Sequence, residues 1–128
     1  MSITTRILVV EDNEDNLSLV RFLLEQAGYT VQEARNGHQA IEMAQDSPDM
    51  ILLDMGIPEV DGWTVASHLK DDPRTRDLCI VALTGHILQG DRKKAIDAGC
   101  AGFISKPMDI PNFIPQVNSY LEKFKGAS

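Results

Sequence analysis

The chain has 128 residues, of which 43% are apolar and 24% are charged, a composition typical of a single globular domain rather than a disordered chain. It carries 12 Lys+Arg against 19 Asp+Glu, so its formal net charge is −7. This balance argues against a nucleic-acid binder or a polybasic membrane-surface protein, because both need clustered Lys and Arg.

The cysteines, the apolar runs and the first residues exclude further classes of protein. The two cysteines are too few for a disulfide framework or a four-ligand zinc site. The longest apolar run, residues 78–83, is far shorter than the ~20 residues that span a bilayer, and residues 1–6 do not resemble a signal peptide. We therefore expect a cytoplasmic protein with one domain over residues 1–128, no membrane insertion and no DNA-binding output domain.

Short apolar runs predict strands, and apolar residues at helical spacing predict the helices between them. The predicted strands cover residues 7–10, 29–34, 50–53, 78–83 and 101–105. The predicted helices cover a segment that ends before Gly28, then residues 37–45, 62–70 and 89–98, and a last segment with an apolar stripe at Phe113, Val117, Tyr120, Leu121 and Phe124. Pro111 suits the first turn of the last helix, whereas Pro115 is expected to disturb the next turn.

Five strands alternating with five helices predict an α/β fold, in which a parallel sheet carries helices on both faces. In such folds, ligands bind beyond the carboxyl ends of the strands, where the strand order reverses. Polar residues that directly follow an apolar run are therefore the first candidates for a site.

Four of the five predicted strands end in residues that can carry chemistry. Glu11 and Asp12 follow the first strand, Asp54 the third, Thr84 the fourth and Lys106 the fifth. Each residue alone has a structural explanation, such as a turn or an exposed amine, but agreement among four strand ends is far more specific. Crowded carboxylates repel one another and need a cation, and Mg²⁺ suits a site of oxygen ligands that also binds phosphate.

These residues resemble the receiver domain of bacterial two-component response regulators. The resemblance extends from Arg6 to about Phe124. The motifs that carry it are Leu8-Val9-Val10-Glu11-Asp12-Asn13, Leu53-Asp54 followed by Pro58 and Asp61-Gly62, Ala82-Leu83-Thr84, and Lys106-Pro107. The resemblance implies a flavodoxin-like (βα)5 fold with the strand order 2-1-3-4-5.

The resemblance also implies roles for the acidic residues. Asp54 would be the phosphoacceptor that attacks a phosphoryl group carried by a partner's histidine. Asp12, Asp54 and the backbone carbonyl of Gly56 would bind Mg²⁺ directly, and Glu11 would bind it through water. Gly56 replaces the bulkier residue that is common two positions after the acceptor, which leaves the dephosphorylation rate open.

By the same resemblance, Thr84 and Lys106 would bind phosphoryl oxygens. Phe103 stands where the family carries its switch aromatic, so inward movement of Thr84 would make room for the rotation of Phe103. The Lys106–Pro107 peptide bond would be cis, and Gly85 would leave the switch loop uncrowded. The output would be a shift between two surface shapes.

The implied partners are proteins. The phosphoryl donor would be a histidine kinase or a histidine phosphotransfer protein, and a downstream protein target would bind through the last two helices. No direct contact with nucleic acid is expected. A phosphorylation-dependent dimer, and a role as a relay intermediate rather than a terminal regulator, stay open.

As a signalling protein of this kind, the chain is not expected to be an enzyme. Two other classes of protein are alternatives to this function. A phosphohydrolase of the haloacid dehalogenase type also uses a strand-end aspartate and Mg²⁺, but its second acid would fall at Gly56. A degenerate receiver that acts as a constitutive adaptor would have lost one or more of Asp12, Asp54, Thr84 and Lys106, and all four are present.

Overall fold

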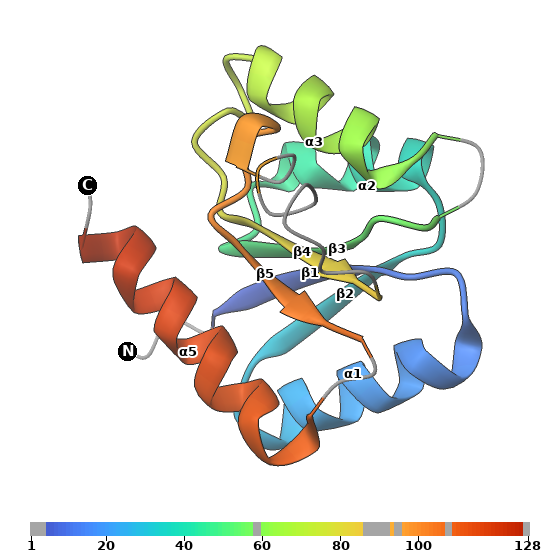
Figure 1. Cartoon of the computed structure of the whole chain (residues 1–128), viewed down its shortest axis with the longest axis vertical. Coiled ribbons are helices and arrows are strands. Elements are labelled where there is room, and N and C mark those ends of the chain that lie inside the picture. Colours follow the sequence, from blue (N-terminus) through green and yellow to red (C-terminus); the bar gives the residue numbers. More distant parts are fainter. Residues whose placement is uncertain (1–4, 58–59, 86–92, 94–95, 107–108, 127–128) are drawn as a thin grey trace.

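A computed structural model of the chain describes residues 5–57, 60–85, 93, 96–106 and 109–126. Its centre is a five-stranded sheet in which all neighbouring strands run parallel, in the order β2-β1-β3-β4-β5 (Figure 1). The strands are β1 Arg6–Val10, β2 Thr30–Ala34, β3 Met50–Asp54, β4 Ile80–Thr84 and β5 Gly102–Ser105. The predicted fold and strand order are thereby confirmed.

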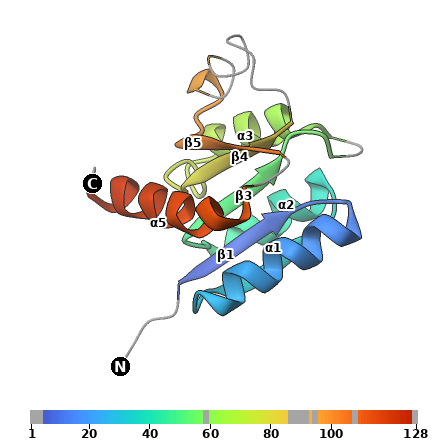
Figure 2. The ribbon, with the colours of Figure 1, turned by 60° about the horizontal axis from the view of Figure 1, so that its bottom comes forward.

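Helices cover both faces of the sheet. The helices are α1 Glu14–Gln26, α2 Gly37–Met43, α3 Gly62–Asp71 and α5 Ile110–Gly126, with a short 3₁₀ helix at Ala44–Asp46. Helices α1 and α5 lie on one face and α2 and α3 on the other, as both views of the ribbon show (Figures 1 and 2). The predicted helix at 89–98 falls largely outside the described residues, but 93, 96 and 97 within it are helical.

The core has two layers because successive side chains of a strand point to opposite faces. In the central strands β1 and β3, both faces are buried, which explains their continuous apolar runs. Ile7 and Val9 pack toward α1 and α5, whereas Leu8 and Val10 pack toward α2 and α3. The two layers fix the sheet rigidly, so the residues at its strand ends have defined positions.

Three helices begin at a polar side chain that caps the first turn. Asn13, Asn36 and Asp61 each accept a hydrogen bond from a backbone N–H three residues later, at 2.9–3.0 Å. At the other end of α1, Gly28 adopts φ = 94°, the left-handed conformation expected of a glycine just after a helix. These caps place helix starts in the segments that follow β1, β2 and β3.

The element boundaries differ slightly from the predicted ones. Strand β4 begins at Ile80 rather than residue 78, and β5 begins at Gly102 rather than residue 101. The last helix runs from Ile110 to Gly126 with Pro115 inside it, so the expected disturbance at Pro115 does not end the helix. Phe113 and Val117, on either side of Pro115, are fully buried, and their packing holds the helix in place.

Candidate functional site at the carboxyl ends of the strands

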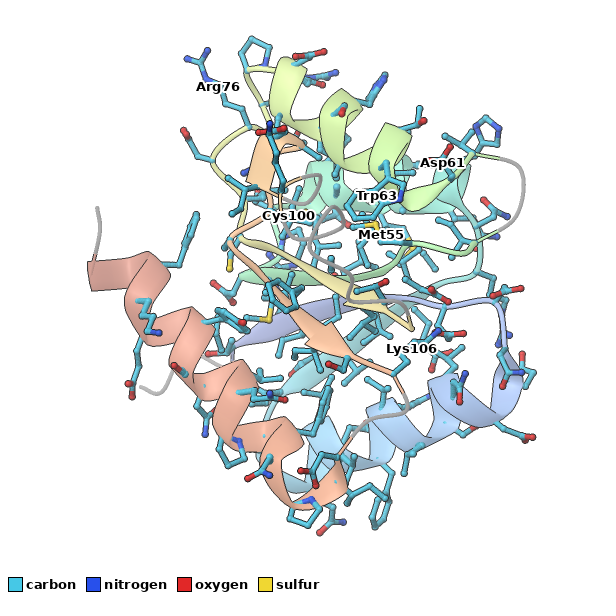
Figure 3. All side chains as sticks on the ribbon, in the orientation of Figure 1. Met55, Asp61, Trp63, Arg76, Cys100 and Lys106 are labelled. Atoms are coloured by element: carbon cyan, nitrogen blue, oxygen red, sulfur yellow. The ribbon has the colours of Figure 1, made fainter. Side chains whose placement is uncertain are left out.

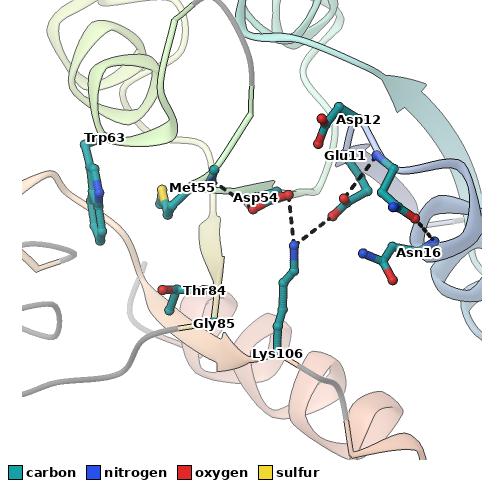
Figure 4. A pocket seen from close by; sticks show the side chains of 11 residues that line it. Glu11, Asp12, Asn16, Asp54, Met55, Trp63, Thr84, Gly85 and Lys106 are labelled. Atoms are coloured by element: carbon teal, nitrogen blue, oxygen red, sulfur yellow. Dashed lines mark hydrogen bonds and ion pairs between the residues drawn. The ribbon is translucent and has the colours of Figure 1, made fainter.

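A pocket of about 540 Å³ opens at the carboxyl ends of β1, β3, β4 and β5 (Figure 4). It lies where the strand order reverses, at the ends of β1 and β3. The described residues that line the pocket are Glu11, Asp12, Asn13, Asn16, Asp54, Met55, Gly56, Trp63, Thr84, Gly85 and Lys106. Six of the seven candidates from the sequence therefore meet in one place.

Three carboxylates form the centre of the pocket. Glu11 and Asp54 are buried, with 2% and 5% of their surface exposed, whereas Asp12 is exposed. One oxygen from each of the three lies within 4.8 Å of the others. Hard divalent cations prefer oxygen ligands, and an open side at Asp12 leaves room for water or phosphate oxygens. This donor set fits Mg²⁺.

Lys106 lies between two of the carboxylates. Its Nζ is 2.9 Å from Asp54 Oδ2 and 3.3 Å from Glu11 Oε2 (Figure 4). Burial alone would lower the pKa of Lys106, but the hydrogen bond to Asp54 and the charges of Asp54 and Glu11 outweigh it and raise the pKa. Lys106 is therefore a fixed positive charge beside the Asp54 carboxylate.

Glu11 is a carboxylate whose surroundings disfavour its ionised form. Its burial, together with the negative charge of Asp54 and a hydrogen bond with Asp54, raises its pKa above the ordinary value. Lys106 and a backbone hydrogen bond from Asn13 N–H, at 3.2 Å, oppose that shift. A cation bound between Glu11 and Asp54 would remove the repulsion that causes it.

Backbone groups orient the Asp54 carboxylate. The Gly56 N–H donates to Asp54 Oδ1 at 2.9 Å, while Oδ2 accepts from Lys106. The β3–α3 turn also needs Gly62, because a Cβ there would lie 2.5 Å from Met55 Cα. At Gly56, by contrast, a Cβ would meet only Asp54 Oδ1, at 3.7 Å, so this side of the pocket is open.

The two candidate switch residues have different surroundings. Thr84 lines the pocket, and its backbone carbonyl accepts from the Lys106 N–H at 2.9 Å. Phe103 is not among the described residues that line the pocket; it is half-buried and packs against the core layer under α2 and α3. The expected cis bond at Lys106–Pro107 lies outside the described residues, because Pro107 is not described.

Sequence reasoning did not assign Asn13, Asn16, Met55 or Trp63 to the site. Met55, which follows β3, and Trp63, in α3, both line the pocket (Figures 3 and 4). Trp63 packs against the core and also forms part of the pocket wall. The available signal was position, since Trp63 stands in the first turn of α3, directly after the cap Asp61.

Comparisons with known proteins decide the family. The family model described as the response regulator receiver domain matches residues 7–118 of this chain. The chain belongs to the receiver domain family of response regulators. Receivers are signalling domains rather than metabolic enzymes, and membership places the chain in two-component signalling.

Named relatives agree with this assignment. The chain is 41% identical over 116 residues to the polar-differentiation response regulator DivK of Brucella anthropi, which covers 90% of this chain and 94% of that protein. The DivK of Brucella ovis is 40% identical over 119 residues, covering 92% of this chain and 97% of that one. This receiver is thus similar to a response regulator of nearly the same length.

Solved structures give the same result. The receiver domain of a sensor histidine kinase from Pseudomonas aeruginosa, described with a magnesium ion coordinated in its active site cleft, is 30% identical with a TM-score of 0.84, over 94% of this chain and 99% of that one. The chemotaxis response regulator CheY4 of Vibrio cholerae, 22% identical with a TM-score of 0.86 over 92% of this chain and 99% of that one, shares the fold. In the part of the receiver that is described, no helix has the length and hydrophobicity needed to cross a membrane.

Proposed function

We propose that Asp54 is the phosphoacceptor of this receiver and takes a phosphoryl group from a phosphorylated histidine of a histidine kinase or a histidine phosphotransfer protein. The observation that carries the proposal is the Lys106 Nζ at 2.9 Å from one oxygen of a buried aspartate whose other oxygen accepts the Gly56 N–H. This pairing orients the carboxylate and places positive charge where negative charge would accumulate.

In the proposed transfer, an oxygen of Asp54 attacks the phosphorus atom, the bond from phosphorus to the donor's imidazole nitrogen breaks, and the imidazole leaves and takes up a proton. Apart from the attacking oxygen of Asp54, the protein contributes position and charge. Lys106 would exchange its contact with Asp54 for one with a phosphoryl oxygen. The Coulomb attraction of such a pair near 4 Å is about 4 kcal/mol at an effective dielectric of 20, before the cost of desolvation.

Glu11, Asp12 and Asp54 would hold Mg²⁺, together with the backbone carbonyl of Gly56. When bound, the ion would neutralise charge on the carboxylates and on the incoming phosphoryl group. The support is the donor set itself, since three carboxylate oxygens lie within 4.8 Å of one another and two of the three residues are buried. Lys106 provides one positive charge, which is fewer than the three negative charges of these carboxylates when all are ionised.

The proposed output is a change of surface for a protein target. Phosphorylation would replace the single charge of the Asp54 carboxylate with a phosphoryl group of about −2 and would bring new acceptor oxygens beside Thr84. Thr84 would move inward to donate a hydrogen bond, and Phe103 would then rotate into the space that Thr84 vacates. Because the backbone carbonyl of Phe103 on β5 accepts a hydrogen bond from Tyr120 of α5, the surface that would report the change includes the last helix.

The test is intact-mass spectrometry of the full chain after incubation with a small phosphodonor and Mg²⁺. We expect an adduct of about 80 Da, the mass of one phosphoryl group, that is lost in Asp54→Asn and absent without a divalent cation. Asp71→Asn, which changes an exposed carboxylate on α3, is the matched control and should be labelled like the unsubstituted chain.

An adduct that persists in Asp54→Asn would contradict the proposal. So would the absence of an adduct on the unsubstituted chain under conditions that label a known receiver. The second result would favour the constitutive adaptor, and sustained turnover of p-nitrophenyl phosphate would favour the phosphohydrolase.

A further inference from the structure

Tyr120 of α5 makes a contact with β5 that the proposed phosphoryl chemistry does not use. Its hydroxyl donates a hydrogen bond to the backbone carbonyl of Phe103 at 3.0 Å, across 17 residues of sequence. The ring itself is half-buried and packs against the core layer that α1 and α5 cover. Tyr120 therefore binds the peptide group that directly follows the candidate switch residue.

Gly102 makes this contact sterically possible. A Cβ at position 102 would lie 2.1 Å from Tyr120 Cε1 and 2.4 Å from Cζ, far inside contact distance. The Tyr120 ring consequently lies directly on the backbone of β5, with no side chain between them. Ring and hydroxyl together hold two successive residues of the strand, Gly102 and Phe103.

The position of β5 matters because the strand carries Lys106 into the pocket. β5 is a four-residue strand at the edge of the sheet, and among the described strands it pairs with β4 alone. Lys106 follows one residue after the strand ends, and its Nζ must stay within hydrogen-bonding distance of Asp54 on β3. A support for β5 on its helix-covered face therefore bears on the placement of Lys106.

We propose that Tyr120 is a positioning residue for the phosphoacceptor site: it holds β5 so that Lys106 reaches the phosphoryl group on Asp54. This inference rests on the function proposed above. It separates two groups of ligands, because the carboxylates that would bind Mg²⁺ come from the β1 and β3 ends, whereas Lys106 comes from β5. Loss of the Tyr120 hydroxyl should weaken contacts to the phosphoryl group and spare the metal.

The test uses Tyr120→Phe, which removes only the hydroxyl. Two affinities of the full chain are measured by isothermal titration calorimetry: Mg²⁺ alone, and beryllofluoride, a phosphoryl analogue, at saturating Mg²⁺. We expect beryllofluoride to bind about threefold to tenfold more weakly, the range that corresponds to one net hydrogen bond, with no loss of Mg²⁺ affinity. Gly102→Ala, which would displace the ring, should weaken beryllofluoride in the same direction.

Tyr29→Phe is the matched control, because the Tyr29 hydroxyl also bonds α5, through the Asn118 side chain, but does not touch β5. It should change neither affinity. Beryllofluoride binding in Tyr120→Phe equal to that of the unsubstituted chain, or an equal loss of Mg²⁺ affinity, would overturn the role of Tyr120. Absence of beryllofluoride binding in the unsubstituted chain would contradict the proposed function, and with it this inference.

Discussion

Lys106 has two effects of opposite sign at the residue scale. Its ammonium group forms ion pairs with the carboxylates of Glu11 and Asp54, and it would also stabilise a phosphoryl group on Asp54. The same positive charge repels a divalent cation that binds the same carboxylates. Metal binding and phosphorylation should therefore respond in opposite directions when the charge is removed.

We predict that Lys106→Met, which keeps much of the side-chain length and removes the charge, binds Mg²⁺ several-fold more tightly. Its labelling by a small phosphodonor should be slower by about tenfold or more, because one charged group that stabilises the transition state is missing. Calorimetry and a mass-spectrometric time course measure the two effects. Lys123→Met, on the exposed surface of α5, is the control. A weaker Mg²⁺ affinity in Lys106→Met would contradict this account of its charge.

The two cysteines allow a prediction about pH. Burial raises the pKa of Cys79 and of Cys100 (Figure 3) to about 11, from an ordinary value of 9.0. The folded state therefore favours the protonated thiols, and the stability that they contribute is present below pH 9 and is lost as the pH rises through about 11.

Because the thiolate is the reactive form, we expect iodoacetamide to alkylate the native chain at about pH 8 at least tenfold more slowly than the chain unfolded in urea. The native rate should climb as the pH approaches 11. Intact mass against time measures both rates. Equal rates for native and unfolded chain at the lower pH would show that burial does not protect these thiols.

At the scale of elements, Pro115 is the clearest local conflict with its surroundings. It lies inside α5, where proline lacks the N–H that would bond the carbonyl four residues back. Pro111 also lies in α5 but in its first turn, where an N–H has no partner within the helix. Both residues are exposed, so they differ mainly in the helical hydrogen bond that one of them cannot make.

We predict that Pro115→Ala raises the free energy of unfolding by about 1 kcal/mol, because the regained hydrogen bond and the better helix propensity exceed the extra entropy of the unfolded chain. Urea denaturation measures the change. Pro111→Ala should leave the stability unchanged or slightly lower. A gain of similar size in both variants would show that the position within the helix does not matter.

Much at this scale was predictable from the sequence. The continuous apolar runs at 7–10 and 50–53 can bury both faces only in a central parallel strand, and the polar residues after them then have to meet at one edge. Boundaries were less predictable. The apolar run that precedes β4 starts at Leu78, but the carbonyl of Leu78 accepts a hydrogen bond from Lys70 Nζ at 2.8 Å, and the strand begins two residues later.

Contacts between distant side chains could not be predicted from local patterns. Nothing near Lys106 in sequence indicates that it bonds both Glu11 and Asp54, and nothing near Gly102 indicates that the Tyr120 ring covers it. The residue types at the site can be predicted from the strand ends and from the family resemblance. The contacts of Lys106 and of Tyr120, by contrast, depend on how β5 and α5 pack. The predicted helix over 89–98 stays a prediction for the residues that are not described.

At the scale of the whole molecule, the net charge of −7 has a local origin. Residues 11–15 hold four acids and residues 54–61 hold three, without Lys or Arg in either segment, so the remaining 19 − 7 = 12 acids equal the 12 bases. Both segments follow strands that end at the pocket. Three of these seven acids, Glu11, Asp12 and Asp54, line the pocket, so part of the excess negative charge lies at the candidate metal site.

Relief of this repulsion should stabilise the folded chain. We predict that Mg²⁺ at about 100 times its Kd raises the free energy of unfolding by about 2.7 kcal/mol, provided that the unfolded chain binds none. Asp12→Asn should lose most of this gain, because it loses a ligand, yet be slightly more stable without the ion. Glu42→Gln, on α2, should keep the full gain. Thermal unfolding at several Mg²⁺ concentrations measures this, and an equal gain in Asp12→Asn would contradict the site.

The central claim is that one carboxylate, Asp54, takes the phosphoryl group. The most direct measurement is to label the full chain with a small phosphodonor and Mg²⁺, reduce the acyl phosphate with borohydride, and sequence the peptides by tandem mass spectrometry. Reduction converts a phosphorylated aspartate into homoserine. The account predicts homoserine at position 54, and none at position 12 or 61. Homoserine at another position, with an intact Asp54, would contradict it.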